Sequence, residues 1–239
     1  MQHEITTSAP LLDEKGNLRE PGYAKRLLPI YRRADIKAPV ARIKEWDYYL
    51  VANDHFAVAL TIADNGYMGL DSVSFLQFDE GWQVTRSPMR LMPLGGTGLP
   101  QSSLRGSCAR AGRGYGLLFQ HEGEGRTLHA HMDRFRDGQA LDAQILLTQE
   151  PEESIVMCTP FEKPGQFYFN QKINCMRAQG KVTLGDREYV FDPEDSFAVL
   201  DWGRGVWTCR GTWYWGSASG MVDGVPFGFN IGYGFGDTS

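Results

Sequence analysis

The sequence predicts an all-β fold built from antiparallel strands. Three observations predict it: apolar and polar residues alternate in short runs, 28 glycines punctuate these runs, and almost no segment has the i, i+3, i+4, i+7 spacing of an amphipathic helix. Many short strands at such spacing are typical of antiparallel barrels and sandwiches. A chain of 239 residues can hold one large β domain or two smaller ones.

The first half is expected to begin with irregular chain and to continue as strands. Residues 1–40 contain a KGN turn and a Pro-Gly pair and have little helical propensity. Alternating runs then follow, separated by Gly, Asn and Asp: DYYLVAND, HFAVALTIAD, SVSFLQF and GYGLLFQHEG. The Gly- and Ser-rich stretch from Pro93 to Gly116 favours a long loop, either a lid or a connector.

The second half repeats the strand pattern, in LDAQILLTQ, SIVMCTPF, QFYFNQKINCMRAQGKVTLGDREYVFD and VDGVPFGFNIGYGFGD. The third run contains AQG and then LGDREY, a spacing that favours consecutive antiparallel hairpins. The best helix candidate is DPEDSFAVLDWGR, where Asp192 can cap a short helix that begins at Pro193. We expect one brief helix at most.

The last run has one large face and one nearly bare face. On an extended chain one face carries Phe227, Phe229, Ile231, Tyr233 and Phe235, and the other carries Gly228, Asn230, Gly232 and Gly234. A glycine face weakens a strand and indicates that a backbone, a bulky aromatic group or a ligand comes close. We favour a structural close approach over a ligand.

Composition predicts a globular protein and restricts its partners. A hydrophobic fraction of 42% and a charged fraction of 22% are sufficient for an apolar core. With a formal net charge of -5, nucleic acid is not an expected partner. We find neither a membrane-spanning apolar run nor a secretory signal, which favours a cytoplasmic protein. The cysteines are widely separated and are expected to be reduced, buried apolar residues: Cys108, Cys158, Cys175 and Cys209.

Lys172 is the first candidate functional residue. By alternation it shares a polar strand face with Asn170 and Asn174. If that face points into a cavity, a desolvated lysine beside amides can bind a carboxylate or take part in proton transfer. If it points to water, Lys172 has no special role.

The segment LDWGRGVWTCRGTWYWGSASG gathers four of the six tryptophans around charged residues. One hypothesis is a structural corner in which Asp201 and Arg204 pair and tie strands together. The other is a pocket with Arg204 at its mouth, in which the tryptophans of like parity form one wall. Those tryptophans are Trp207, Trp213 and Trp215, whereas Trp202 has the opposite parity.

No metal or cofactor site is predicted. His129 and His131 point to one face of a strand with Asp133 nearby, but the further ligands that a cupin supplies are absent. Proton transfer is the better functional interpretation of this pair, and a partly exposed strand face is the default one. GxSxG, P-loop, GxGxxG and HExxH motifs are also missing.

The order of several motifs resembles a known family. LLDEKGNLREPGYA, KEWDYY, IADNGYMG, FNQKINCM and DWGRGVWTCRGTWYWGSASG together are similar to the bacterial domain-of-unknown-function 2804 family, related to the AttH and carotenoid 1,2-hydratase proteins of the lipocalin-like superfamily. The match spans most of the chain, and DWGRG with the tryptophan-rich strand is its most specific part. The matched positions are Trp46, Asp47, Tyr67, Lys172, Asp201, Arg204, Trp213 and Trp215.

The resemblance implies lipocalin-like (calycin) β-barrels in tandem, with a ligand cavity at their junction. We therefore expect an irregular segment packed on the barrel over residues 1–40, a first barrel domain over 41–150 and a second β domain over 151–239. Members of the family continue past GFGDTS, so we expect the second barrel to be incomplete here. An unpaired C-terminal strand would favour self-association.

Two functions remain open at this point. The first is a binding module for an apolar small molecule of isoprenoid, polyene or acyl type. The second is a cofactor-independent hydratase, isomerase or cyclase that uses acid catalysis, although no clear counterpart to the hydratase motif is found. The predicted catalytic residues are Asp201 and Lys172, and the predicted ligand-binding residues are Arg204, Trp207, Trp213, Trp215, Asn170, Trp46 and Tyr67.

Overall fold

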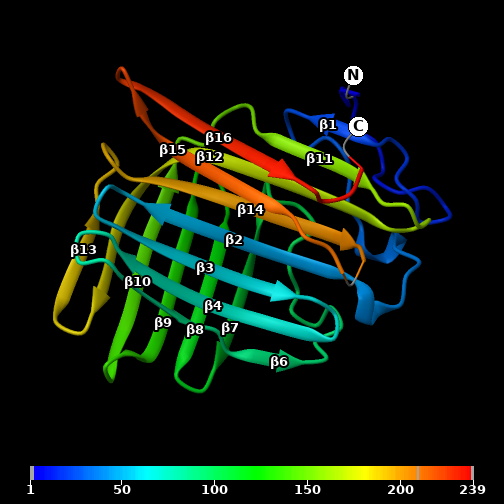
Figure 1. The fold of residues 1–239 in the computed structure, drawn as a ribbon. Coiled ribbons are helices and arrows are strands. Elements are labelled where there is room, and N and C mark those ends of the chain that lie inside the picture. The colour runs from blue at the N-terminus through cyan, green and yellow to red at the C-terminus, as the bar shows by residue number, and fades with distance from the viewer. Residues whose placement is uncertain (1–2, 209, 238–239) are drawn as a thin grey trace.

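The computed structural model describes residues 3–208 and 210–237 and is an all-β, antiparallel protein (Figure 1). Its helical elements in these ranges are two 3-10 turns, Arg33–Asp35 and Val40–Arg42. The strands are β1 (Gly22–Ala24), β2 (Lys44–Ala52), β3 (Phe56–Asp64), β4 (Met68–Gln77), β5 (Trp82–Arg86), β6 (Met89–Leu91), β7 (Gly106–Gly112), β8 (Tyr115–His121), β9 (Arg126–Arg136), β10 (Gln139–Thr148), β11 (Ile155–Pro160), β12 (Phe167–Leu184), β13 (Arg187–Phe191), β14 (Phe197–Val206), β15 (Tyr214–Val222) and β16 (Val225–Tyr233).

Fourteen strands form one sheet. Ten of them follow one another in the order β5-β4-β3-β2-β14-β12-β10-β9-β8-β7. Off this path, β11 and β13 pair with β12, β1 pairs with β11, and β6 pairs with β4. Among the described strands no ladder joins β5 to β7, so hydrogen bonds do not close the sheet. A separate hairpin, β15 with β16, forms a second, two-stranded sheet.

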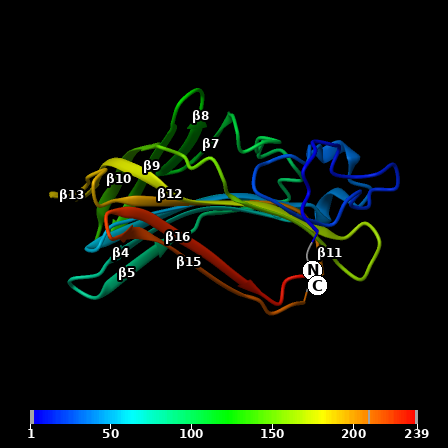
Figure 2. The same ribbon diagram turned by 90° about the horizontal axis from the view of Figure 1, so that it is seen from above.

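The large sheet folds over on itself through the long strand β12. The first part of β12 pairs with β14 and β11, and its last part pairs with β10 and β13. A register shift between Ile173 and Met176, with Cys175 at a φ of 60°, marks the change of direction. As a result β7–β10 cross one face of the β2–β4 layer, and the β15–β16 hairpin lies on the other face (Figure 2).

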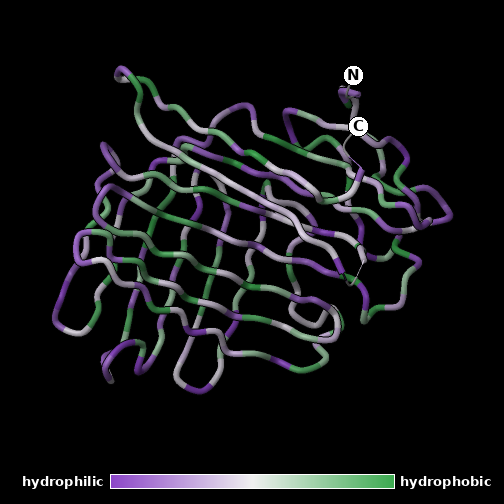
Figure 3. The backbone as a smooth tube through the Cα atoms, viewed as in Figure 1, coloured by the Kyte–Doolittle hydropathy of each residue, from purple (hydrophilic) through white to green (hydrophobic). Residues whose placement is uncertain are grey.

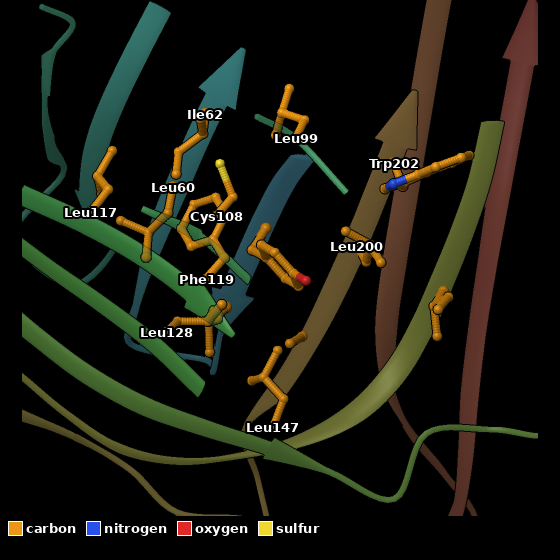
Figure 4. Close-up of a cluster of buried hydrophobic side chains, with 14 of the residues drawn as sticks. Leu60, Ile62, Leu99, Cys108, Leu117, Phe119, Leu128, Leu147, Leu200 and Trp202 are labelled. Carbon is orange, nitrogen blue, oxygen red and sulfur yellow. The ribbon is translucent and has the colours of Figure 1, made fainter. Parts of the chain in front are cut away.

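The hydrophobic core lies between the two layers of the folded sheet. Alternate residues of the crossing strands meet there, among them Leu60 and Ile62 from β3 and Leu117 and Phe119 from β8, all at most 3% exposed (Figure 4). Hydrophobic residues follow the strands, and hydrophilic ones occupy many of the turns (Figure 3). The large sheet is therefore held together by packing as well as by its ladders.

The described cysteines differ in burial. Cys108 and Cys158 are buried and free, and burial raises the pKa of each thiol to about 12. Cys175 is free and partly exposed. Cys209 lies outside the described residues. The prediction of buried, apolar cysteines is confirmed for Cys108 and Cys158.

Two local predictions are corrected by the structure. Asp192 begins a turn, in which its carbonyl accepts from the Ser196 amide, and no helix forms before β14 starts at Phe197. All ten residues of β14 are buried because the strand lies inside the sheet and is covered on both faces. Its apolar run therefore lacks alternation, and the sequence pattern fits a helix equally well. The loop expected between Pro93 and Gly116 is present up to β7, which begins at Gly106 and pairs with β8, so the prediction is corrected only in its second half.

The expected domain limits fall at recognisable places in the chain. Position 40 lies in the second 3-10 turn, and position 150 lies between β10 and β11. Before β2 the described chain contains only β1 and the two 3-10 turns, yet Ile5, Leu11 and Tyr31 are buried against the core. One sheet contains strands from both expected domains. The division into domains stays a prediction.

Candidate functional site

A cavity of about 1220 Å³ lies between the outer face of the large sheet and the β15–β16 hairpin. Its floor comes mainly from β2, β3, β11, β12 and β14, and its roof comes from β15, β16 and the segments that flank them. Floor and roof belong to different sheets, so the space between them is not filled by a continuous ladder. This cavity is the candidate functional site.

Strand alternation decides which residues of β14 face the cavity. Asp201 points to the cavity, while its neighbours Leu200 and Trp202 point into the core. Gly203 follows on the cavity side, where a Cβ atom would overlap the Trp46 ring. Gly205 has a φ of +154°, and a Cβ there would overlap the carbonyl of Phe167. The two glycines of DWGRG therefore allow an indole ring and a neighbouring strand to lie close.

Aromatic rings line one end of the cavity. Trp46 stacks on Tyr168 with ring centroids 5.7 Å apart, and Trp207 meets both rings edge-on at 5.3 and 5.5 Å. Phe235 packs against Tyr168 at 4.6 Å and against Trp213 at 5.1 Å. Such offset and edge-to-face contacts hold the rings in fixed positions around the space.

A compact polar group occupies the floor. Lys172 on β12 lies opposite Asp201 on β14, and its Nζ atom is 2.6 Å from Asp201 Oδ1; each side chain is 13% exposed. The ammonium also lies 4.5 Å from the centroid of Trp215 in the roof. Asn170, two residues before Lys172, is 2% exposed, and its Oδ1 atom has no hydrogen-bond partner.

Two tyrosines next to this polar group are kept neutral. Burial raises the pKa of Tyr168 well above its usual value, and the charge of Asp201 raises it further. Tyr48, which pairs in register with Asp201 and meets Trp215 edge-on, has a pKa raised by the same two causes. Phenolic hydroxyls at these positions can donate hydrogen bonds but resist ionisation.

The hairpin roof is attached to β12 through its bare face. Asn174 Nδ2 donates to the carbonyl of Ala218 at 2.8 Å and to Ser217 Oγ at 2.9 Å. Gly228 is close to β12, because a Cβ there would lie 2.7 Å from the Sγ atom of Cys175. The close approach predicted for the glycine face is thus confirmed at Gly228, whereas a Cβ atom at Gly232 would meet nothing within 4 Å.

The aromatic face of β16 points outward instead. Phe227, Phe229, Ile231 and Tyr233 are between 42% and 74% exposed. Phe235 does not continue this face as predicted, because β16 ends at Tyr233 and Gly234 follows with a φ of +83°. The change of direction at Gly234 brings Phe235 to the aromatic end of the cavity.

Arg204 lies on the opposite side of β14 from the cavity. It is fully buried, donates to Asp47 Oδ1 at 2.8 Å and to the carbonyl of Pro100 at 2.8 Å, and lies over the Trp202 ring. Arg204 therefore does not lie at the mouth of the pocket and does not pair with Asp201, which corrects both hypotheses. Alternation separates residues 201 and 204 onto opposite faces of an extended strand.

The structure brings the other predicted site residues together around one cavity. Besides the Lys172 and Asp201 pair, the lining includes Trp46, Tyr67, Asn170, Trp207, Trp213 and Trp215. The like parity of Trp207, Trp213 and Trp215 does not explain why they meet at the cavity. The chain leaves β14 at Val206 and enters β15 at Tyr214, so these residues do not lie on one extended strand. Sequence reasoning missed Tyr48 and Tyr168, which alternation from Trp46 and Lys172 could have found. The ligand-binding and catalytic roles stay predictions.

The histidine pair lies away from this cavity. His131 is hydrogen-bonded to Asp142 at 2.7 Å and to Asp133 at 3.0 Å, and its side chain is 45% exposed. The bond to Asp142 is the main cause of a raised pKa of His131, and the bond to Asp133 adds to it. In the described ranges no three His, Cys, Asp or Glu residues are arranged to hold a metal ion. None of the described helices has the length and apolarity needed to span a bilayer.

The chain is similar to solved structures at low sequence identity. A putative AttH from Nitrosomonas europaea is 13% identical with a TM-score of 0.50, and the alignment covers 95% of this chain and 68% of that one. Kievitone hydratase from Nectria haematococca is 10% identical with a TM-score of 0.39, covering 88% of this chain and 61% of that one. The first likeness shows a common fold, and the second is too weak to support an argument.

The sequence comparisons assign the chain to a family. No curated protein matches it. A family model described as a domain of unknown function, DUF2804, matches residues 2–239. That match covers nearly the whole chain, including both the floor and the roof of the cavity. The protein therefore belongs to the DUF2804 family.

Proposed function

We propose that the protein binds an apolar small molecule, of isoprenoid, polyene or acyl type, in the cavity under the β15–β16 hairpin. The observation that carries the proposal is a space of about 1220 Å³ lined at one end by indole rings. Ligand sites are typically concave and mostly apolar, with a few polar groups that fix orientation. The proposed architecture is lipocalin-like (calycin), with barrels in tandem, and the fold shared with the AttH structure supports its all-β, antiparallel character.

The apolar lining gives the binding its driving force. Removing apolar surface from water contributes about 25 cal/mol for each Å², and flat ring faces present such surface to a long unsaturated chain. Trp46, Trp207 and Trp213 lie at the aromatic end, and Lys172 with Asp201 lies on the floor. A bound molecule would place its hydrocarbon part against the rings and a polar end near the ion pair.

The direct test is a search for a co-purifying ligand. Protein purified without detergent is examined by native mass spectrometry and, after solvent extraction, by small-molecule mass spectrometry. All-trans-retinol is then titrated in, with quenching of tryptophan fluorescence as the signal. We expect saturable quenching at one site. Absence of both an extracted ligand and saturable quenching would contradict the proposal.

A Trp46→Ala variant sharpens this test, because the ring of Trp46 stacks in the cavity. Trp82→Ala is its matched control, since Trp82 lies on β5, outside the cavity lining. Loss of retinol binding in the first variant and retention in the second would place the ligand under the hairpin. Equal loss in both would contradict that placement.

The second candidate function is acid catalysis in the same cavity, as a cofactor-independent hydratase, isomerase or cyclase. The specific observation in its favour is the Lys172 and Asp201 pair next to two neutral tyrosines. In this scheme a positioned acid protonates an alkene carbon, and the cation then adds water, loses a proton or closes a ring. Asp201→Asn and Lys172→Met separate the two functions. Turnover lost with binding retained supports catalysis, and turnover unchanged in both variants contradicts it.

The remaining parts of the proposal are self-association and location. The hairpin shares no ladder with the large sheet in the described chain, and its outer face exposes Phe227, Phe229, Ile231 and Tyr233. A second copy of the chain can cover an uncharged face of this kind and pair its strand edge. Sedimentation should show a dimer that Ile231→Glu dissociates; a monomer at all concentrations would contradict it. A cytoplasmic location stays a prediction.

A further inference from the structure

The polar floor of the cavity contains more hydrogen-bond acceptors than donors. Asn170 Oδ1 has no partner, although the residue is 2% exposed. Asp201 Oδ1 also has no hydrogen-bond partner of acceptable geometry, although Lys172 Nζ lies 2.6 Å away as an ion pair. The ammonium supplies charge to this oxygen but leaves an acceptor direction unfilled. A buried acceptor without a donor is unfavourable, because it has lost its hydrogen bond to water without gaining another.

The two acceptors lie close together on neighbouring strands. Asn170 pairs in register with Gly203, and Lys172 pairs with Asp201, so the polar side chains occupy adjacent positions of one face. Gly203 contributes no side chain between them, and Trp46 covers it from the side. Asn170 and Asp201 both belong to the cavity lining, so one small polar group of a ligand at this part of the floor would lie next to both side chains.

The charges of the floor select among the polar groups that a ligand can carry. Lys172 is already paired with Asp201, so a carboxylate would bring a second negative charge and two more acceptors. A ligand ammonium would bring a second positive charge next to Lys172. Other cations of the lining are engaged as well: Lys25 with Glu153, Arg177 with two carbonyl oxygens, and Lys44 over the Trp207 ring.

We infer that the ligand of this cavity carries a neutral hydroxyl group, as an alcohol or a phenol, which donates a hydrogen bond to Asn170 or Asp201. A hydroxyl has one donor and two acceptor sites, so it also complements the amide nitrogen of Asn170. It adds no charge to the balanced pair. The inference rests on the proposed binding function and narrows its ligand class to apolar alcohols.

The test compares three probes that share one polyene and differ only in the polar end: all-trans-retinol, retinyl methyl ether and all-trans-retinoic acid. Binding to the wild-type protein is measured at pH 8 by tryptophan quenching. We expect retinol to bind about tenfold more tightly than the ether, which lacks a donor, and than the ionised acid. The ether or the acid binding as tightly as retinol would overturn the inference while leaving the binding function intact. Failure of all three to bind would overturn both.

The second experiment tests whether the ion pair decides between a neutral and a negatively charged ligand. Asp201→Asn removes the partner of Lys172, so retinoic acid should gain affinity and retinol should lose its preference over the acid. Asp137→Asn, at a side chain 82% exposed on the surface, is the matched control and should keep the wild-type order. Thermal unfolding confirms that each variant is folded. An unchanged order of probes in folded Asp201→Asn would overturn the role of the ion pair.

Asn170→Leu tests the other acceptor independently of charge. It removes one of the two acceptors and should narrow the preference for retinol over the ether, without improving the binding of the acid. An unchanged preference for retinol over the ether in folded Asn170→Leu would overturn the role of Asn170. The wild-type comparison of the three probes decides the matter even where a variant fails to fold.

Discussion

The two faces of β14 carry ion pairs in different surroundings. On the core face, Arg204 is fully buried, bonds to Asp47 and lies over the Trp202 ring. On the cavity face, Lys172 and Asp201 are each 13% exposed and border an open volume. The first pair is enclosed by protein, while the second can be reached by water or by a ligand. Charge type alone therefore does not separate a structural pair from a candidate functional one.

The largest expected effect is on the core face. Arg204→Met leaves Asp47 buried without its cation, while Glu45 keeps Arg33 as a partner, and should lower the free energy of unfolding by about 3–5 kcal/mol. Urea denaturation measures it. Arg187→Met is the control, because Arg187 pairs with Glu80 at the surface, where solvent screens the pair, and its loss should change stability far less. Equal losses in the two variants would remove the distinction between an enclosed and an exposed pair.

Lys172→Met should have a smaller effect on stability. The variant leaves Asp201 without its ion-pair partner, but the carboxylate borders the cavity and can be hydrated. We expect a loss of about 1.5–3 kcal/mol, in the range of one hydrogen bond to a charged group. The same urea experiment measures it. A loss larger than that of Arg204→Met would contradict the view that the cavity face is the more tolerant one.

The attachment of the hairpin can be tested with two glycines. In Gly228→Ala the new methyl group would lie 2.7 Å from Cys175 Sγ and 2.9 Å from Asn174 Cβ, whereas in Gly216→Ala it would meet nothing within 4 Å. We expect Gly228→Ala to destabilise the hairpin by about 1–2 kcal/mol. Hydrogen exchange of β15 and β16 should speed up in this variant and stay unchanged in Gly216→Ala. Faster exchange throughout the large sheet would show that the hairpin is not a separate unit.

The smallest effect concerns His131, outside both ion pairs. The folded pKa is raised above its usual value of 6.5, chiefly by the bond to Asp142. Its stabilisation is therefore fully present below pH 6.5 and is lost as the pH rises through the folded pKa. Because the side chain is 45% exposed, we expect less than about 1 kcal/mol. Unfolding of wild type and His131→Gln should differ at pH 5.5 and coincide at pH 9; a difference that grows with pH would contradict this.

The sequence was sufficient for most of the strand content and for the cavity face of β12. Alternation placed Asn170 and Lys172 on one face, and the cavity lies there. It failed where it was not applied consistently: Asp201 and Arg204 were grouped by proximity in the sequence, although an odd spacing puts them on opposite faces. Helix and strand could not be separated in the apolar run of β14, because a strand covered on both faces has no alternation.

A pocket was a hypothesis from the tryptophans and from the resemblance, but its position under the hairpin could not be predicted from the sequence. The cavity exists because the hairpin lies over the outer face of the sheet, and that placement depends on long-range contacts between Asn174 and the hairpin. The bare face of β16 signalled a close approach but not its partner. The sequence also could not predict that Phe227, Phe229 and Ile231 point outward, because large apolar side chains are usually buried.

The separate ladder of the β15–β16 hairpin has a consequence for how such a protein can diversify. Sequence changes in the hairpin alter the volume and chemistry of the chamber without disturbing the hydrogen bonds of the fourteen-stranded scaffold. The roof of the cavity can thus vary in sequence while the strands that carry its floor keep their ladders.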